Sequence, residues 1–134
     1  KEREKSHVIT DFIIKAKKYK KINMLTDGKE KRDFLYSEDC CAGLELIMGN
    51  YNYYKKEKEI HLTTTNFTSI IEIANIIKKK FLKQGINIKI IKSKKKDTLQ
   101  FNQQNKANKF FLKYWKPKYS LKEGISEITN FYLK

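Results

Sequence analysis

The stretch KRDFLYSEDCCAGLELIM, residues 31–48, decides how this chain is interpreted. Near its start is Arg32, one of two arginines in a chain that otherwise uses lysine for its positive charge, just ahead of a short aromatic β-prone run. Ser37, Glu38 and Asp39 follow with the composition of a helix start, in which a capping residue precedes acidic residues that complement the helix dipole. Apolar residues then recur at helical spacing. The stretch therefore predicts a strand that leads directly into a helix.

Similar patterns on either side predict that helices alternate with short strands. Ser69 with Glu72, and Ser120 with Glu123, have the spacing of capping boxes at the starts of two helices. Between the elements, Asp27-Gly28 is a turn signal. The expected elements are a helix over 7–20 capped by Ser6, strands over 22–26 and 33–36, a helix from Ser37 to Gly49, a surface loop over 50–59, a strand over 60–64, a helix over 70–84, a strand over 86–92, a short helix over 105–114 and a helix over 121–133. This order predicts an α/β (α+β) fold.

Length and composition indicate one domain with an unusual charge. The chain has 134 residues, 40% of them hydrophobic, and a formal net charge of +15. Such a charge attracts nucleic acid and anionic surfaces. However, the charge comes from a general use of lysine, and no zinc-finger spacing, other metal-ligand spacing or arginine-rich segment accompanies it. We therefore expect no metal site, and a small basic nucleic-acid-binding module is the weaker alternative.

The cysteines and the apolar segments indicate a cytoplasmic location. Cys40 and Cys41 are adjacent, so they cannot join distant parts of the fold through a disulfide. No apolar run has the length of a membrane span, and the first residues, KEREKSHV, lack the apolar core of a signal peptide. The charged start is what we expect of a fragment of a longer enzyme.

Four segments in order resemble one known family. They are SHVITDFI, DGKEKRDFLYSEDCCAGLELIM, TSIIEIANIIKKKF and NKANKFFLKYWKPKYSLKEGI, and they run along nearly the whole chain. Together they resemble the C-terminal half of the extended short-chain dehydrogenase/reductase family, which comprises NAD(P)-dependent sugar-nucleotide epimerases, dehydratases and reductases. The resemblance is slightly greater to the GDP-sugar branch, and in particular to the GDP-fucose synthase group, than to the UDP-sugar branch.

The resemblance implies that residues 1–134 form the sugar-nucleotide-binding domain of a longer enzyme. The rest of that enzyme would be an N-terminal Rossmann domain that holds NAD or NADP. The resemblance leaves open whether the whole enzyme forms a homodimer. The scattered glycines here do not supply a Rossmann phosphate turn, so this chain alone is expected to bind no cofactor. Tyr-x-x-x-Lys occurs at Tyr51, Tyr54 and Tyr114, but such matches arise by chance in a chain rich in both residues, and no catalytic residue is assigned. A truncated, inactive remnant is a further alternative.

The resemblance also assigns substrate contacts. Arg32 occupies the arginine position of the family's RDF motif, which contacts the substrate diphosphate, and a guanidinium fork matches phosphate oxygens better than a lysine does. The alternative is a surface salt bridge between Arg32 and Glu30 or Asp33. Relatives carry a second diphosphate-binding arginine in a later loop, where Lys94 is the best match here. The hypothesis is therefore a phosphate pocket lined by Arg32 and lysines.

Further contacts are expected at the first strand and the first helix. Asn23 and Leu25 share one face of the strand and are candidates to contact the nucleotide base. Ser6, His7 and Val8, at the start of the first helix, are candidates to close over the nucleotide. By contrast, Asp33 and Asp39 are expected to be structural, with Asp39 orienting a helix.

Overall fold

The computed structural model describes residues 7–97 and 107–134. The elements, in chain order, are α1 (Val8–Tyr19), β1 (Lys21–Asn23), β2 (Lys31–Asp33), α2 (Ser37–Gly49), α3 (Tyr51–Tyr54), β3 (Phe67–Ser69), α4 (Ile70–Leu82), β4 (Lys89–Ile91), the 3-10 helix η1 (Phe110–Lys113) and α5 (Leu121–Leu133). This mixture of helices and short strands confirms the predicted α/β (α+β) class. Within the described residues, no helix is both long enough and apolar enough to cross a bilayer.

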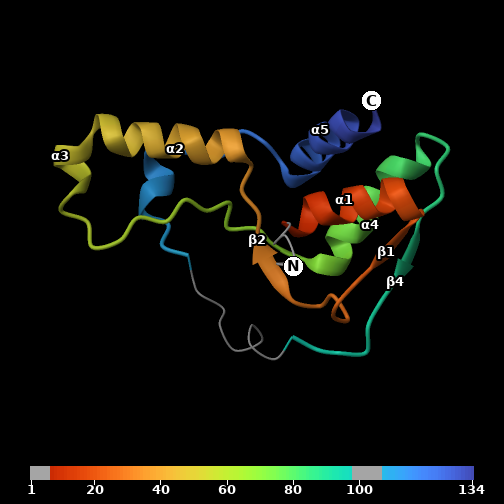
Figure 1. Ribbon diagram of the computed structural model, residues 1–134. Coiled ribbons are helices and arrows are strands. Elements are labelled where there is room, and N and C mark those ends of the chain that lie inside the picture. The colour runs from red at the N-terminus through yellow and green to blue at the C-terminus, as the bar shows by residue number, and fades with distance from the viewer. Residues whose placement is uncertain (1–6, 98–106) are drawn as a thin grey trace, which may run out of the picture.

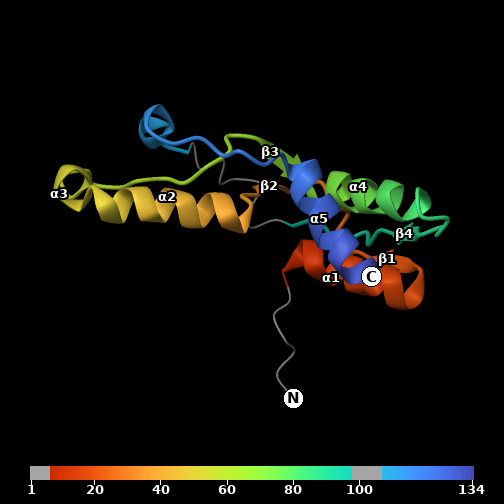
Figure 2. The ribbon, with the colours of Figure 1, turned by 90° about the horizontal axis from the view of Figure 1, so that it is seen from above.

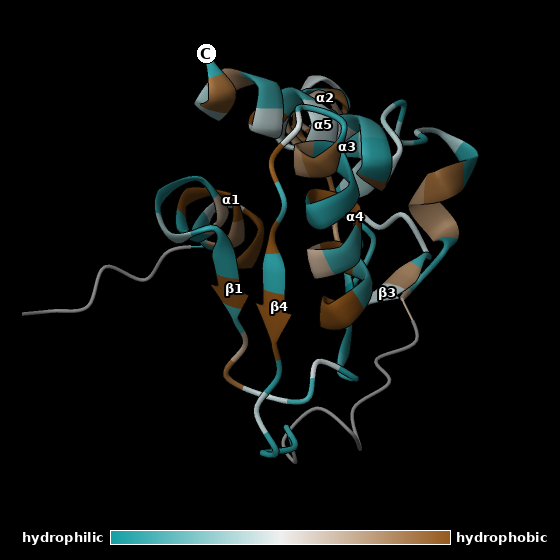
Figure 3. Cartoon of the chain, turned by 90° about the vertical axis from the view of Figure 1, so that its right-hand side faces the viewer, coloured by the Kyte–Doolittle hydropathy of each residue, from teal (hydrophilic) through white to brown (hydrophobic). Residues whose placement is uncertain are grey.

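The main core lies where α1, α4 and α5 pack against one another and against β1 and β4. Figure 3 shows the two strands side by side, with α1 next to β1 and α4 next to β4. The fully buried side chains of this core include Ile22 of β1 and, from the apolar sides of the three helices, Ile13, Ile77, Phe81 and Ile125. Each of the three helices thus contributes apolar side chains to one core.

The strands form two separate pairs. β1 and β4 are parallel, with Ile22 opposite Ile90, whereas β2 and β3 are antiparallel, with Arg32 opposite Thr68. The turn expected at Asp27-Gly28 is confirmed, since Gly28 has a φ of 76°. The runs on either side of it do not pair with each other, however, because parallel pairing with β4 places Ile22 in the core and leaves β2 to pair with β3.

The two predicted capping boxes are confirmed. The Glu72 carboxylate accepts a hydrogen bond from the Ser69 backbone N–H at 2.8 Å, and the Glu123 carboxylate accepts one from the Ser120 N–H at the same distance. In return, each serine hydroxyl accepts a bond from the backbone N–H of its glutamate. Both helices therefore begin at the residue that the sequence predicts.

The starts of α1 and α2 differ from prediction. Ser6 lies outside the described residues, and His7 occupies the N-cap position of α1 without a side-chain cap. Tyr36, not Ser37, is the N-cap of α2, because the Tyr36 carbonyl already accepts the Cys40 N–H at 3.0 Å and closes the first turn.

We expect the capping box of α4 to make stability depend on pH. The hydrogen bonds from Ser69 hold the pKa of the Glu72 carboxyl below its ordinary value of 4.5. A carboxyl whose pKa is lower in the folded state stabilises the fold above its unfolded pKa, and this contribution is lost as the pH falls through the folded pKa. Comparing the free energy of unfolding of wild type and Glu72→Gln should therefore show a difference at pH 7 that disappears toward pH 3. A difference that stays constant across this range would contradict the assignment.

The rest of the chain forms a second cluster around α2. In Figures 1 and 2, α2 and α3 extend away from the helices of the main core. Tyr54, Phe111 and Trp115 are the buried residues of this cluster. Gly43 of α2 is closely packed there, because a Cβ on it would lie 2.5 Å from the Leu62 side chain.

Three local predictions in this region were wrong. The expected loop over 50–59 contains the short helix α3, and the helix expected within 105–114 is a 3-10 turn in the part that the structure describes. Residues 60–64, expected as a strand, are irregular. Within the described chain no strand lies alongside them, and the Thr64 backbone N–H donates a hydrogen bond to the Asp33 carboxylate instead.

Candidate functional site

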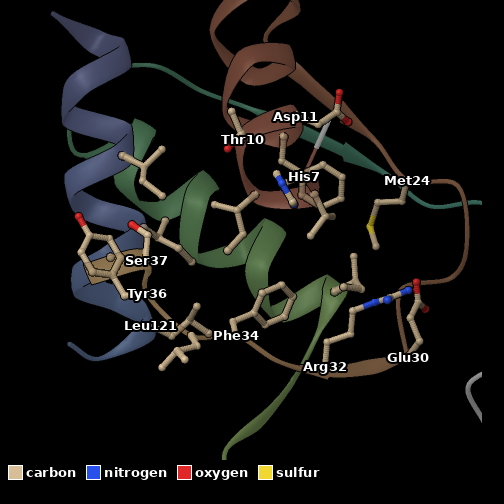
Figure 4. Close-up of a pocket in the computed structure, with 18 of the residues that line it drawn as sticks. His7, Thr10, Asp11, Met24, Glu30, Arg32, Phe34, Tyr36, Ser37 and Leu121 are labelled. Atoms are coloured by element: carbon tan, nitrogen blue, oxygen red, sulfur yellow. The ribbon is translucent and has the colours of Figure 1, made fainter. Parts of the chain in front are cut away.

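A cavity of about 1080 Å³ opens between four parts of the fold. Its walls are the start of α1, the segment after β1, the connection from β2 to α2, and the start of α5 (Figure 4). Apolar side chains such as Met24, Phe34 and Leu121 form much of the lining. Most of the segments that the sequence singled out as substrate contacts thus meet at one cavity.

Arg32 reaches this cavity because of its place on β2. Successive side chains of a strand point to opposite faces, so Arg32 lies on the face opposite Asp33. The Asp33 carboxylate accepts hydrogen bonds from the Thr63 and Thr64 hydroxyls and from the Thr64 backbone N–H at 3.0 Å. These bonds tie β2 to the segment before β3. Asp33 is therefore structural, as expected, and it fixes the strand that presents Arg32.

The ion pair of Arg32 is a loose one. Arg32 Nη2 lies 3.8 Å from Asp97 Oδ2, and the arginine side chain keeps 45% of its surface exposed. Glu30 and Asp33, the partners that the alternative interpretation named, are not within ion-pair distance of it. At 3.8 Å the pair is too long for a strong hydrogen bond, so an anion with better geometry can compete for the guanidinium.

Two acidic residues beside Arg32 were not predicted as site residues. Glu30 and Asp97 both line the cavity. One Glu30 oxygen accepts a hydrogen bond from the Thr26 hydroxyl at 2.5 Å, and the other, Oε2, is buried without a hydrogen-bond partner among the described residues. A buried unpaired acceptor costs free energy, so this oxygen is suited to a donor group of a ligand. No sequence signal marked either residue.

The hypothesis of a lysine-lined pocket is wrong in its detail. Lys94 is exposed and is not part of the cavity wall. Among the described lysines, Lys15 lines the cavity, and its ammonium group is 2.5 Å from the Asp11 carboxylate. Arg32 is thus the cation best placed to attract an anion into the cavity.

Tyr36 and Tyr119 form a second polar group at the α2 and α5 side of the cavity. Their rings lie 4.5 Å apart. The Tyr36 hydroxyl donates to the Glu127 carboxylate at 2.5 Å, and this bond raises the pKa of Tyr36 to about 12. The bond from Tyr119 to Glu38 likewise raises the pKa of Tyr119. Both phenols therefore stay protonated near neutral pH, which suits hydrogen bonding and not general-base chemistry.

Asp39 positions the segment that leads into α5. Its side chain is buried, and its two oxygens accept the backbone N–H groups of Lys118 and Tyr119 at 2.9 and 3.0 Å. This carboxylate holds the WKPKYS segment against the start of α2 and so places Leu121 at the cavity. The expected helix-orienting role of Asp39 agrees with these contacts.

The predicted site residues divide into three groups. His7, Val8, Asn23, Leu25 and Arg32 line the same cavity. Lys94 does not line it, and Ser6 lies outside the described residues. That these residues bind substrate stays a prediction. The part of the chain that the structure describes contains no group of three or more His, Cys, Asp or Glu side chains placed to hold a metal ion.

Comparison with known proteins supports the resemblance to this family. The model of the NAD-dependent epimerase/dehydratase family matches residues 1–63, which include β1, β2 and α2. Together with the fold, this match confirms the resemblance to the extended short-chain dehydrogenase/reductase family. Members of this family are NAD(P)-dependent sugar-nucleotide enzymes.

Individual proteins that are similar to this chain also support the resemblance. A GDP-L-fucose synthase of Sinorhizobium fredii (strain NGR234) is 36% identical over 77 residues, which are 54% of this chain and 24% of that protein. The structure of an epimerase from Methanothermobacter thermautotrophicus matches with a TM-score of 0.74 and 21% identity, over 96% of this chain and 37% of that one. A GDP-mannoheptose C4 reductase from Campylobacter jejuni, solved with NADP bound, matches with a TM-score of 0.62 and 25% identity, over 85% of this chain and 32% of that one. The chain thus spans well under half the length of these relatives.

Proposed function

We propose that this chain is the substrate-binding part of an NAD(P)-dependent sugar-nucleotide epimerase, dehydratase or reductase. In this proposal the cavity between α1, β1, β2 and α5 takes the nucleoside diphosphate of a GDP- or UDP-sugar. The placement of Arg32 carries the proposal, since it lies on the cavity wall together with Asn23 and Leu25 from the segment expected to contact the base. NAD or NADP, and the residues that perform the hydride chemistry, would belong to the rest of the parent enzyme.

The described side chains allow specific roles in binding. The guanidinium of Arg32 would donate two hydrogen bonds to phosphate oxygens and displace the Asp97 carboxylate as its partner. The buried Oε2 of Glu30 would accept a hydrogen bond from a donor on the base or the ribose. Met24 and Phe34 would exclude water from the bound nucleotide and so strengthen these polar contacts.

Calorimetric titration of the chain with GDP, UDP and guanosine tests the proposal. We expect a diphosphate to bind and guanosine to bind much more weakly, since the diphosphate supplies the charge that Arg32 recognises. A short DNA duplex distinguishes the basic nucleic-acid module. Binding of DNA that weakens steeply with salt, without binding of GDP or UDP, would overturn the proposal. Binding of neither would favour the inactive remnant.

Neutralising Asp97 should increase nucleotide affinity. In Asp97→Asn the diphosphate no longer competes with a carboxylate for Arg32, and the negative charge near the phosphates is removed. We expect GDP or UDP, whichever binds more tightly, to bind several-fold more tightly at low salt, with a smaller gain at high salt because ions screen exposed charges. Asp27→Asn is the matched control, since Asp27 is a turn residue that does not line the cavity. An affinity that falls in Asp97→Asn would contradict the competition between Asp97 and the ligand.

A further inference from the structure

The carboxylate of Glu30 uses only one of its two oxygens within the described fold. Oε1 accepts a hydrogen bond from the Thr26 hydroxyl at 2.5 Å, while Oε2 is buried and has no hydrogen-bond partner among the described residues. Folded proteins rarely leave a buried acceptor unpaired, because the group has lost its hydration without compensation. Since Glu30 lies in the cavity wall, a bound ligand is in a position to supply the missing donor.

The turn between β1 and β2 fixes the orientation of this carboxylate. Gly28, with a φ of 76°, reverses the chain between Thr26 and Glu30, and its backbone N–H donates to the Thr26 hydroxyl oxygen at 3.2 Å. The Thr26 hydroxyl in turn donates to Glu30 Oε1. A hydroxyl has one hydrogen, so Thr26 does not also satisfy Oε2. Oε2 is therefore available to a donor from a ligand.

Glu30 and Arg32 point to the same side of one extended segment. The Glu30 carbonyl accepts the Ile70 backbone N–H at 3.1 Å, so the pairing between β2 and β3 continues back to Glu30. Side chains two residues apart on a strand share a face and lie roughly 7 Å apart along it. Figure 4 shows both side chains pointing into the cavity toward Met24. A ligand whose phosphate is bound by Arg32 therefore has its adjoining group close to Glu30.

The position of Glu30 favours the ribose among the donors of a nucleotide. Ionised phosphates offer acceptors only. The base is expected at Asn23 and Leu25, and the residue that holds the Glu30 carboxylate, Thr26, follows them directly. Glu30 thus lies between the expected base site and Arg32, as the ribose lies between the base and the diphosphate. The ribose carries two adjacent neutral hydroxyls, which are suitable donors to a carboxylate.

We propose that the Glu30 carboxylate binds the ribose hydroxyls of the substrate nucleotide and makes the cavity selective for ribonucleoside diphosphates over their deoxy counterparts. This assignment rests on the proposed function, which places a nucleoside diphosphate in the cavity with its phosphates at Arg32. It adds a residue that recognises the ribose to one that recognises the phosphates.

The assignment fixes the sign of the effect of Glu30 on binding. A carboxylate near the phosphates repels them, so Glu30 favours the complex only if its hydrogen bonds to the ligand outweigh this repulsion. Removing Glu30 should therefore weaken binding, whereas neutralising Asp97 should strengthen it. The two acidic residues beside Arg32 thus have opposite expected effects.

Calorimetric titration with nucleotides that lack ribose hydroxyls tests the proposal. GDP, 2′-deoxy-GDP and 2′,3′-dideoxy-GDP are titrated into the wild-type chain of 134 residues. We expect the dideoxy nucleotide to bind about tenfold or more weakly than GDP, because a hydrogen bond to a charged group corresponds to about 10- to 100-fold in affinity. The 2′-deoxy nucleotide should lie between them. UDP and its dideoxy form should show a similar ratio, since the base is not involved.

Glu30→Ala should remove this preference. The variant should bind GDP about as weakly as wild type binds dideoxy-GDP, and it should bind dideoxy-GDP at least as tightly as wild type does, because a negative charge near the phosphates is gone. Glu45→Ala is the matched control, since it removes an exposed carboxylate that does not line the cavity, and it should keep the wild-type ratio. Comparing nucleotides within each variant separates the hydroxyl contact from a general change of the cavity.

Three results would overturn the proposal. The first is equal binding of GDP and dideoxy-GDP to wild type, a comparison that needs no variant. The second is a Glu30→Ala protein that keeps the wild-type ratio, which would assign the hydroxyls to another residue. The third is a Glu30→Ala protein that loses affinity for GDP and not for UDP, which would make Glu30 a contact of the base. In all three, binding of GDP that depends on Arg32 leaves the proposed function intact. Binding of no diphosphate at all would instead refute the proposed function, and the assignment of Glu30 with it.

Discussion

Replacing Arg32 by alanine is expected to weaken the binding of GDP or UDP by about 10- to 100-fold. A hydrogen bond between charged groups contributes roughly 1.5–3 kcal/mol, and each 1.4 kcal/mol corresponds to a tenfold change in affinity. The guanidinium is partly exposed and its ion pair with Asp97 is 3.8 Å long, so little interaction energy is lost when Arg32 exchanges Asp97 for a phosphate. Calorimetric titration measures the change.

Two controls make this prediction specific. Lys94→Ala removes an exposed positive charge that does not line the cavity, so it should change affinity only slightly and mainly at low salt. Arg32→Lys keeps the charge but loses the planar fork, so its affinity should fall between that of wild type and that of Arg32→Ala. Equal small effects of Arg32→Ala and Lys94→Ala would refute the role assigned to Arg32.

The second large effect is expected from Asp39→Ala, which should lower the free energy of unfolding by about 3 kcal/mol. The substitution removes the buried carboxylate that accepts the Lys118 and Tyr119 backbone N–H groups, and a hydrogen bond to a charged group contributes roughly 1.5–3 kcal/mol. Urea denaturation of the two proteins gives the difference. Glu45→Ala is the control on the same helix, since Glu45 is exposed, and it should change stability by less than about 0.5 kcal/mol.

Asp39→Asn refines the test. The amide keeps one acceptor oxygen but places an NH₂ group opposite a backbone donor, so we expect a loss of stability close to that of Asp39→Ala. Because Asp39 also places the start of α5 at the cavity, both variants should bind nucleotide more weakly even under conditions in which they remain folded. An Asp39→Ala protein as stable as Glu45→Ala would show that the two hydrogen bonds are not important for the fold.

The parts of the fold that the sequence predicted best depend on local physics. The starts of α4 and α5 were predicted at the correct residue, because a capping box is formed by side chains three residues apart and needs no distant partner. The core-facing side of α4 also follows from local physics, since 3.6-residue periodicity places Ile73 and Ile77 on one side of the helix, where both are buried.

The strands were predicted less well because a strand needs a partner. The sequence predicted a turn at Asp27-Gly28 but not the partner of either flanking run, and in the structure β1 pairs with β4 and β2 with β3, which lie far along the chain. Residues 60–64 have a strand-like composition but no described strand beside them. Pairing depends on which backbone edges meet, and no short stretch of sequence contains that information.

For the candidate site, the sequence by itself determined the residue types: an arginine in a lysine-rich chain, an acidic helix start, and the order of motifs that resembles one family. Only the tertiary structure decided that Arg32 faces Asp97, that Glu30 has a buried unpaired oxygen, and that Lys94 lies outside the cavity. The physical reason is the separation along the chain over which each interaction acts. Caps, turns and periodicity act over a few residues, whereas a cavity and its charges are formed by side chains that the fold brings together from distant positions.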